Sequence, residues 1–174
     1  MAIVPNYNSD EIADRITRRS QEKIVRALER LCMIGERCVA VARENGNYND
    51  ITGNLRSSIG YIVLYNGVEY RCALASPTNV APGFRIVKRE GKDGKEYTSK
   101  QKVGGDGAEG AKQAKELLDK LKPKYPRGAV LIVCAGMNYA AYVENVHGKR
   151  VLVDAKLKGE QLAQKWFGNR KRKQ

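Results

Sequence analysis

The sequence of 174 residues has very little histidine, tryptophan and phenylalanine. It contains one histidine, one tryptophan and two phenylalanines. A histidine-rich metal centre is therefore excluded. Only Phe84 and Tyr97 lie near the most basic stretch, which is too few aromatics to stack the bases of a single strand. We expect no metal and no cofactor.

Long apolar runs are also missing. The longest one, residues 128–143, is interrupted by Asn138 and is too short and too polar to cross a bilayer. The first residues, MAIVPNYNSDE, have no basic region followed by an apolar core, so we expect no secretory signal and no membrane partner. The four cysteines (Cys32, Cys38, Cys72 and Cys134) have no zinc-site spacing, and we expect them to be reduced and buried.

Positive charge is abundant and unevenly placed. The chain carries 32 Lys and Arg against 19 Asp and Glu, a net charge of +13. Residues 1–84 and 128–155 are close to neutral, whereas residues 85–127 and 156–174 are each strongly basic. A near-neutral core with basic extensions predicts that the extensions reach an acidic partner.

Residues 9–45 have the periodicity of a long amphipathic helix. Ser9 is the expected N-cap, and Gly46 can end the helix. One half of the helical wheel holds the expected core residues, which are Ile12, Ile16, Ile24, Leu28, Leu31, Ile34, Cys38 and Ala42. Val25, Cys32 and Val39 interrupt the polar face. Two interpretations of these residues stay open: they are scattered apolar residues on the surface, or, because such a rod exceeds what this core needs, they mark a contact with another subunit.

A β-hairpin is predicted next. Asn66-Gly67 separates two β-rich runs, residues 58–65 and 68–75, and suits a type I′ turn. Along the second run, alternation predicts one buried face, formed by Val68, Tyr70, Cys72 and Leu74. Residues 76–107 form a long insert in which residues 84–89 and 96–102 could pair around residues 91–94. Such an insert indicates function or disorder.

The remaining elements complete an α+β fold. We expect helices over residues 108–121 and 158–167, and strands over residues 129–135, which should be central, and 150–154. Residues 138–145 stay ambiguous. The prediction is one domain, residues 1–174, with a long N-terminal helix packed on a mostly antiparallel sheet, a second helix, a short C-terminal helix, a basic insert at 76–107 and a basic tail at 168–174.

Enzyme motifs are weak in this sequence. Residues 105–110 match G-x-G-x-x-G, but no convincing strand precedes them and no acid ends the next strand, so we interpret them as a glycine-rich hinge. His147 lies in a turn without a cysteine or aspartate spaced to join it. Four carboxylates lie in the neutral regions (Asp50, Glu69, Glu144 and Asp154), and the sequence does not show whether two of them meet. We expect no catalytic residues.

Basic residues are the candidates for contact with DNA or with a partner protein. They are Arg85, Lys88, Arg89, Lys92, Lys95, Lys100 and Lys102 in the insert, and Arg170, Lys171, Arg172 and Lys173 in the tail. On flexible arms such residues neutralise phosphates without reading base sequence.

Two short segments resemble a known family. Residues 50–59, DITGNLRSSI, resemble the TGxLxxSI segment, and residues 135–144, AGMNYAAYVE, resemble the YAxYVE segment, of the head–tail joining or tail-completion proteins of long-tailed phages. The order of helix, turn, sheet, second segment and C-terminal helix is also that of the family. After Glu144 this chain departs from the family's usual aromatic-Gly-Thr, and its insert is longer.

The resemblance implies a structural virion protein made in the host bacterial cytoplasm, not an enzyme. Such proteins form rings, often of six copies, between the head connector and the tail tube, with packaged DNA passing through the lumen. The motif residues carried over are Thr52, Gly53, Leu55, Arg56, Ser58, Ile59, Tyr139, Ala140, Tyr142, Val143 and Glu144.

These motif residues take structural roles in this reading. Thr52 and Gly53 form a turn, and Leu55 and Ile59 enter the core. The two tyrosines anchor under the helix, and Glu144 pairs with Arg56. The insert projects into the lumen or onto the adjacent ring. The alternative is a nucleic-acid-binding protein with basic arms that does not read sequence.

Overall fold

One long helix organises the molecule. The computed structural model describes residues 8–90, 92 and 94–168. Helix α1 spans Ser9–Glu44, as predicted. Its N-cap is Asn8 rather than Ser9, because the Asn8 side chain accepts a hydrogen bond from the backbone N–H of Asp10 at 3.0 Å. An N-cap residue satisfies N–H groups that have no partner inside the helix.

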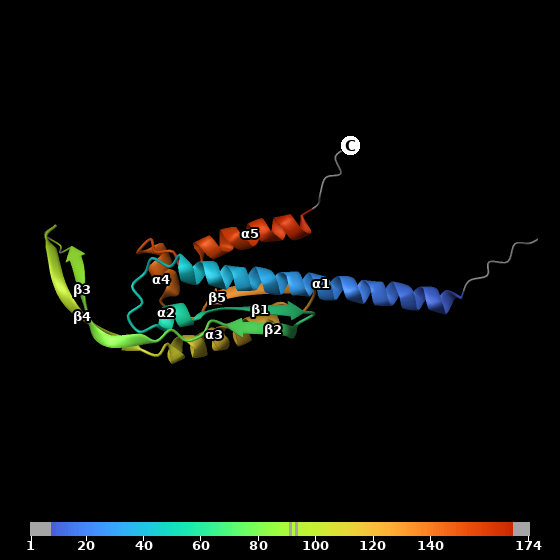
Figure 1. Ribbon diagram of the computed structural model, residues 1–174, viewed down its shortest axis with the longest axis horizontal. Coiled ribbons are helices and arrows are strands. Elements are labelled where there is room, and N and C mark those ends of the chain that lie inside the picture. Colours follow the sequence, from blue (N-terminus) through green and yellow to red (C-terminus); the bar gives the residue numbers. More distant parts are fainter. Residues whose placement is uncertain (1–7, 91, 93, 169–174) are drawn as a thin grey trace, which may run out of the picture.

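Only the second half of α1 packs against the body. Leu28, Ile34, Cys38 and Ala42 are buried, whereas every residue from 9 to 23 is exposed. The expectation that Ile12 and Ile16 lie in the core is therefore wrong. They belong to a part of α1 that projects beyond the end of the sheet (Figure 1). We call this part, residues 9–23, the overhang.

The main sheet has three antiparallel strands in the order β2-β1-β5. The strands are β1 (Ile59–Tyr65), β2 (Val68–Leu74) and β5 (Ala129–Ala135). The predicted turn is confirmed, since Asn66 and Gly67 have φ of 50° and 79°. Strand β5 was expected to be central but lies at an edge. The central strand is β1, six of whose seven residues are buried.

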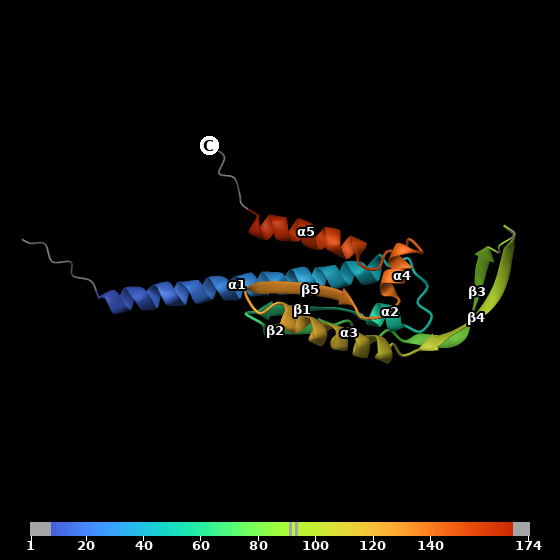
Figure 2. The ribbon, with the colours of Figure 1, turned by 180° about the vertical axis from the view of Figure 1, so that it is seen from behind.

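Helices cover both faces of this sheet. Helix α1 packs on the face of Tyr61 and Val63, and helix α3 (Ala108–Leu121) packs on the face of Ile62 and Leu64 (Figure 2). Cys32, expected on the outward face of α1, is buried beside Tyr61. The resulting layers are helix, sheet and helix. They confirm an α+β fold with a long N-terminal helix and antiparallel sheets.

The edge strand β2 differs from its prediction. Val68 and Tyr70 were expected on a buried face, but both are exposed, and only the second half of the strand is partly buried. The reason is its position, because packing reaches an edge strand only where a helix lies over it.

The insert forms a second, two-stranded sheet. Strands β3 (Val80–Glu90) and β4 (Glu96–Gly105) are antiparallel, with Phe84 opposite Lys102 and Arg89 opposite Tyr97. The predicted pairing is confirmed over longer strands. The hairpin rises away from the body in both views (Figures 1 and 2).

Two helices end the described chain. After the short turn η1 (Lys122–Lys124) and β5, the chain forms α4 (Ala140–Asn145) and α5 (Val153–Phe167), and α5 packs along α1. The strand expected at residues 150–154 is absent from the described structure, and the last helix begins at Val153 instead of at residue 158. Among the described residues, none of the helices has the length and apolarity needed to cross a membrane.

Candidate functional site: the joint between the two motif segments

The two motif segments are far apart in sequence but adjacent in space. Leu55 from the first and Met137 and Ala140 from the second share one buried cluster, together with Tyr48 and Val151. The backbone N–H of Gly136 also donates to the carbonyl of Ser58, at 2.9 Å. We call this region the joint. The prediction that Leu55 and Ile59 enter the core is confirmed, since their side chains are 3% and 0% exposed.

The first segment turns at Gly53 and is clamped by Ser57. Gly53 has a φ of 77°, and a Cβ there would collide with the carbonyl oxygen of Thr78. It precedes the short helix α2 (Asn54–Ser57). The Ser57 hydroxyl donates to the Gly53 carbonyl at 2.6 Å and accepts from the Thr78 N–H at 2.7 Å. The turn therefore holds the chain that leads into the hairpin.

The glycine-rich segment 105–110 is packed tightly against the same turn. A Cβ on Gly105, Gly107 or Gly110 would overlap Thr52, Ser57 or Asn54, respectively. The Gly110 N–H donates to Asn54 Oδ1 at 3.3 Å. The interpretation of this segment as a flexible hinge is wrong, because these glycines allow the start of α3 to approach the motif turn closely.

Three side chains form a half-buried polar group in the joint. Arg56 Nε lies 3.7 Å from Asp50 Oδ2, and the Arg56 guanidinium lies 5.6 Å from the centre of the Tyr48 ring. Burial raises the pKa of Asp50 although Arg56 and nearby backbone N–H groups act to lower it. Among the described residues, Tyr48 Oη and Asp50 Oδ2 are buried without a hydrogen-bond partner.

Glu144 does not pair with Arg56, as was expected. Its Oε1 accepts backbone N–H groups of Val151, Leu152 and Val153 at 3.3, 2.9 and 2.8 Å. These N–H groups lie at the start of α5, where a carboxylate is favoured by the helix dipole. This contact explains why residues 150–154 turn into a helix rather than continue as a strand.

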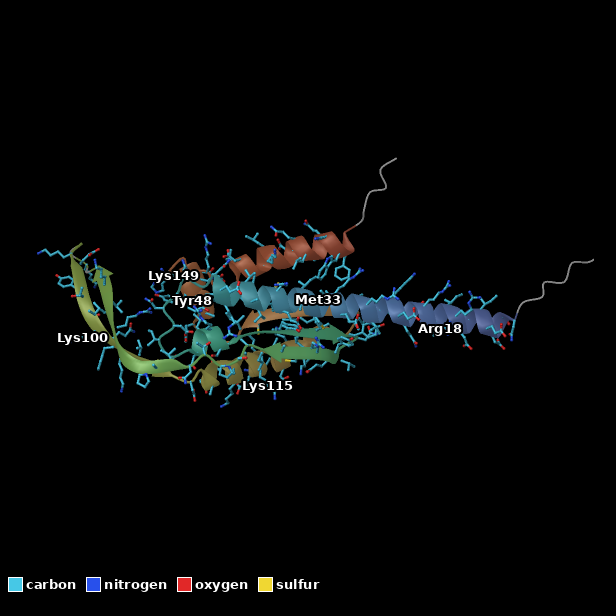
Figure 3. The ribbon with its side chains drawn as sticks, viewed as in Figure 1. Arg18, Met33, Tyr48, Lys100, Lys115 and Lys149 are labelled. Atoms are coloured by element: carbon cyan, nitrogen blue, oxygen red, sulfur yellow. The ribbon has the colours of Figure 1, made fainter. Side chains whose placement is uncertain are left out.

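An open cavity of about 750 Å³ lies between the joint and the middle of the hairpin. Tyr48, Asp50, Leu55, Val87, Gln101 and Met137 are among its lining residues. Tyr48 and Lys149 lie at this end of the body, and Lys100 lies on the hairpin beyond it (Figure 3). Its walls combine polar and apolar side chains.

The two motif tyrosines are not anchors under the helix. Tyr139 and Tyr142 are 38% and 55% exposed, and Tyr142 stacks edge-on against His147 with ring centres 5.0 Å apart. They lie on the outside of the joint, where they are available for contact with another molecule.

The basic residues of the insert spread along the hairpin rather than converging. Arg85 donates to Asn49 Oδ1 at 2.9 Å, and Lys88 pairs with Glu96 at 3.4 Å, both on the surface. The side chains of Lys92, Lys95, Lys100 and Lys102 are exposed. The Arg89 side chain and Arg170, Lys171, Arg172 and Lys173 of the tail lie outside the described structure.

The described residues contain no group of three or more side chains placed to hold a metal ion. Burial raises the pKa of all four cysteine thiols, that of Cys134 to about 12, which disfavours the nucleophilic thiolate. Of the four carboxylates considered from the sequence, the other two also have partners: Glu69 pairs with Lys122 at 2.6 Å, and Asp154 accepts from Asn45 at 2.9 Å. The contacts of the joint hold the two motif segments together and leave the hairpin, Tyr139 and Tyr142 exposed on the surface.

Sequence reasoning missed Tyr48 and Thr78, which complete the joint. An aromatic side chain inside the otherwise polar loop 45–50 was the available signal for Tyr48. Thr78 contributes backbone groups, which leave no sequence signal. Comparisons with protein-family models, with curated proteins and with solved structures found no match for this chain.

Proposed function

We propose that this protein is a ring-forming adaptor of a tailed-phage neck, acting in tail completion between the head connector and the tail tube. The observation that carries the proposal is the joint. Two segments that resemble one family's signatures, about 80 residues apart, share one buried cluster and are joined by the hydrogen bond from the Gly136 N–H to the Ser58 carbonyl. In this proposal the motif residues maintain the fold, and assembly, not catalysis, is the function.

The outline of the molecule supports an assembling role. The overhang of α1 and the β3–β4 hairpin project from opposite ends of the body (Figure 1). A two-stranded sheet and a single helix without tertiary support are each marginal in water. Both projections therefore gain stability from contacts with neighbouring molecules, in a ring or with the adjacent neck layer.

The test is the mass of the purified protein in solution. Light scattering over a range of protein concentrations, followed by electron microscopy of the largest species, should show a discrete closed ring without DNA. The protein should also be found in the neck of purified virions. A chain that stays monomeric at all concentrations and is missing from virions would refute the adaptor.

A nucleic-acid-binding protein is the second candidate, and the exposed bases of the hairpin favour it. In that case duplex DNA should bind at physiological salt, with a steep loss of affinity as salt rises. Lys100→Glu with Lys102→Glu should then weaken binding strongly, and the matched pair Lys112→Glu with Lys115→Glu on α3 should weaken it less. For an adaptor, binding is weak in all three proteins and ring formation does not require DNA.

A further inference from the structure

Strand β5 has one unpaired edge. It pairs with β1 on one side, and no strand of the described structure lies on the other. The register and the bonds Asn66 N–H to Gly128 O and Gly136 N–H to Ser58 O mean that residues 130, 132 and 134 bond to β1. The backbone N–H and C=O groups of Leu131 and Val133 therefore point outward.

This edge lacks the devices that normally protect an edge strand. The seven residues of β5 are all apolar, with no charge and no proline. The other edge, β2, is different: Glu69 pairs with Lys122 at 2.6 Å and Arg71 with Glu36 at 3.4 Å. Charged side chains protect β2 from pairing, whereas β5 is open to an additional strand.

An apolar groove runs beside the open edge. Its volume is about 490 Å³, and it lies between β5, α1 and α5. Leu131 and Val133 line it from the strand, Leu31 and Ile34 from α1, and Ala163 from α5. A strand added to β5 would send alternate side chains into this groove. Main-chain bonds would then give affinity, and the groove would select apolar side chains.

Residues 2–4, Ala-Ile-Val, have the composition that this groove requires, and they lie outside the described structure. They cannot enter the groove of their own chain. Leu31, the groove residue nearest to the start of α1, is 22 residues after Ser9, which is about 33 Å along the helix. The chain from Asn8 back to Ile3 spans at most about 18 Å. Residues 2–4 can therefore reach such a groove only on another copy of the chain.

We propose that residues 2–4 of a second copy add as a strand to the open edge of β5 and place Ile3 in the groove beneath α5. The contact is head-to-tail, because the overhang of one copy meets the body of the next, and repetition of such a contact closes into a ring or extends into a filament. This inference deepens the proposed function by naming the contact between copies.

Disulfide trapping tests the contact directly. The variant Ile3→Cys with Val133→Cys should give interchain disulfides under mild oxidation, joining residues 3 and 133 as identified by mass spectrometry. The matched control, Ile3→Cys with Glu116→Cys on the exposed face of α3, should give at least about tenfold less. Equal trapping in both variants, or an intrachain 3–133 disulfide, would overturn the proposal. A larger yield of interchain disulfide from Ile16→Cys with Val133→Cys would also overturn it, because the overhang of α1 would then lie in the groove instead of residues 2–4.

A second measurement uses a residue outside the folded body. Ile3→Asp should weaken self-association at least about tenfold while leaving helical content unchanged, and Ile3→Val should restore it. If Ile3→Asp assembles as well as the parent chain, the contact is wrong while the ring adaptor stands. If the 3–133 disulfide forms but no closed ring is found in solution or virions, the contact stands and the adaptor falls.

Discussion

The Glu144 carboxylate accepts the backbone N–H of Leu152 at 2.9 Å, and thereby joins the end of the second motif segment to the start of α5. The same oxygen also accepts the N–H groups of Val151 and Val153. Helix α5 packs along α1 and forms one wall of the apolar groove beside β5. The Glu144 side chain of α4 therefore helps to fix the position of a helix that borders the open edge of β5.

Glu144→Ala should lower the free energy of unfolding by about 1–3 kcal/mol, because three N–H groups at the start of α5 lose a charged acceptor. Glu144→Gln, which keeps one oxygen acceptor, should lower the free energy of unfolding by less. Urea unfolding monitored by circular dichroism measures both. The control is Glu116→Ala, an exposed position on α3, for which we expect little change. Equal effects at positions 144 and 116 would contradict this role.

Gly53→Ala should destabilise the protein more than Gly128→Ala. Both glycines have a positive φ, 77° and 78°, so both variants bear a left-handed strain of about 1–2 kcal/mol. A Cβ at Gly128 meets nothing within 4 Å, whereas one at Gly53 collides with the Thr78 carbonyl. The collision should add about 1–3 kcal/mol in thermal or urea unfolding. Identical losses would show that the turn does not clamp the base of the hairpin.

Ionisation of the Asp50 carboxyl group should lower the free energy of unfolding as pH rises through the pKa of this group in the folded protein. Burial raises the pKa of Asp50, so the folded protein binds this proton more tightly than the unfolded chain. The contribution is complete below the ordinary aspartate pKa of about 3.9 and is lost as pH rises through the raised value. Asp50→Asn removes this dependence. The variant should therefore gain stability relative to the parent chain between about pH 3 and pH 7. A relative loss over that interval would contradict the sign.

The native cysteines should resist alkylation. Burial raises the pKa of all four thiols, to about 12 for Cys134, and thiolate is the reactive form. Iodoacetamide at neutral pH should modify Cys134 only on unfolding, and the half-buried Cys72 should react first. Mass spectrometry of tryptic peptides over time gives the order. Rapid labelling of Cys134 in the folded protein would be inconsistent with its place between the sheet and α3.

Local chemistry in the sequence was sufficient to predict most of the elements. The periodicity of residues 9–45 gave α1 within one residue, and Asn66-Gly67 gave the β1–β2 turn, because both features depend on neighbours along the chain. The pairing within the insert followed from two β-rich runs around a glycine-containing turn. The two motif segments were also recognisable as short patterns, although not as partners of each other.

Only the tertiary structure decided which of these surfaces are covered. An apolar strand looks the same in sequence at the centre or at the edge of a sheet, so the edge position of β5 depends on long-range pairing. The exposure of Ile12 and Ile16 follows from where the sheet ends, and the role of Glu144 follows from the approach of α5. Periodicity determines which face of an element is apolar, but burial depends on whether another element lies against that face.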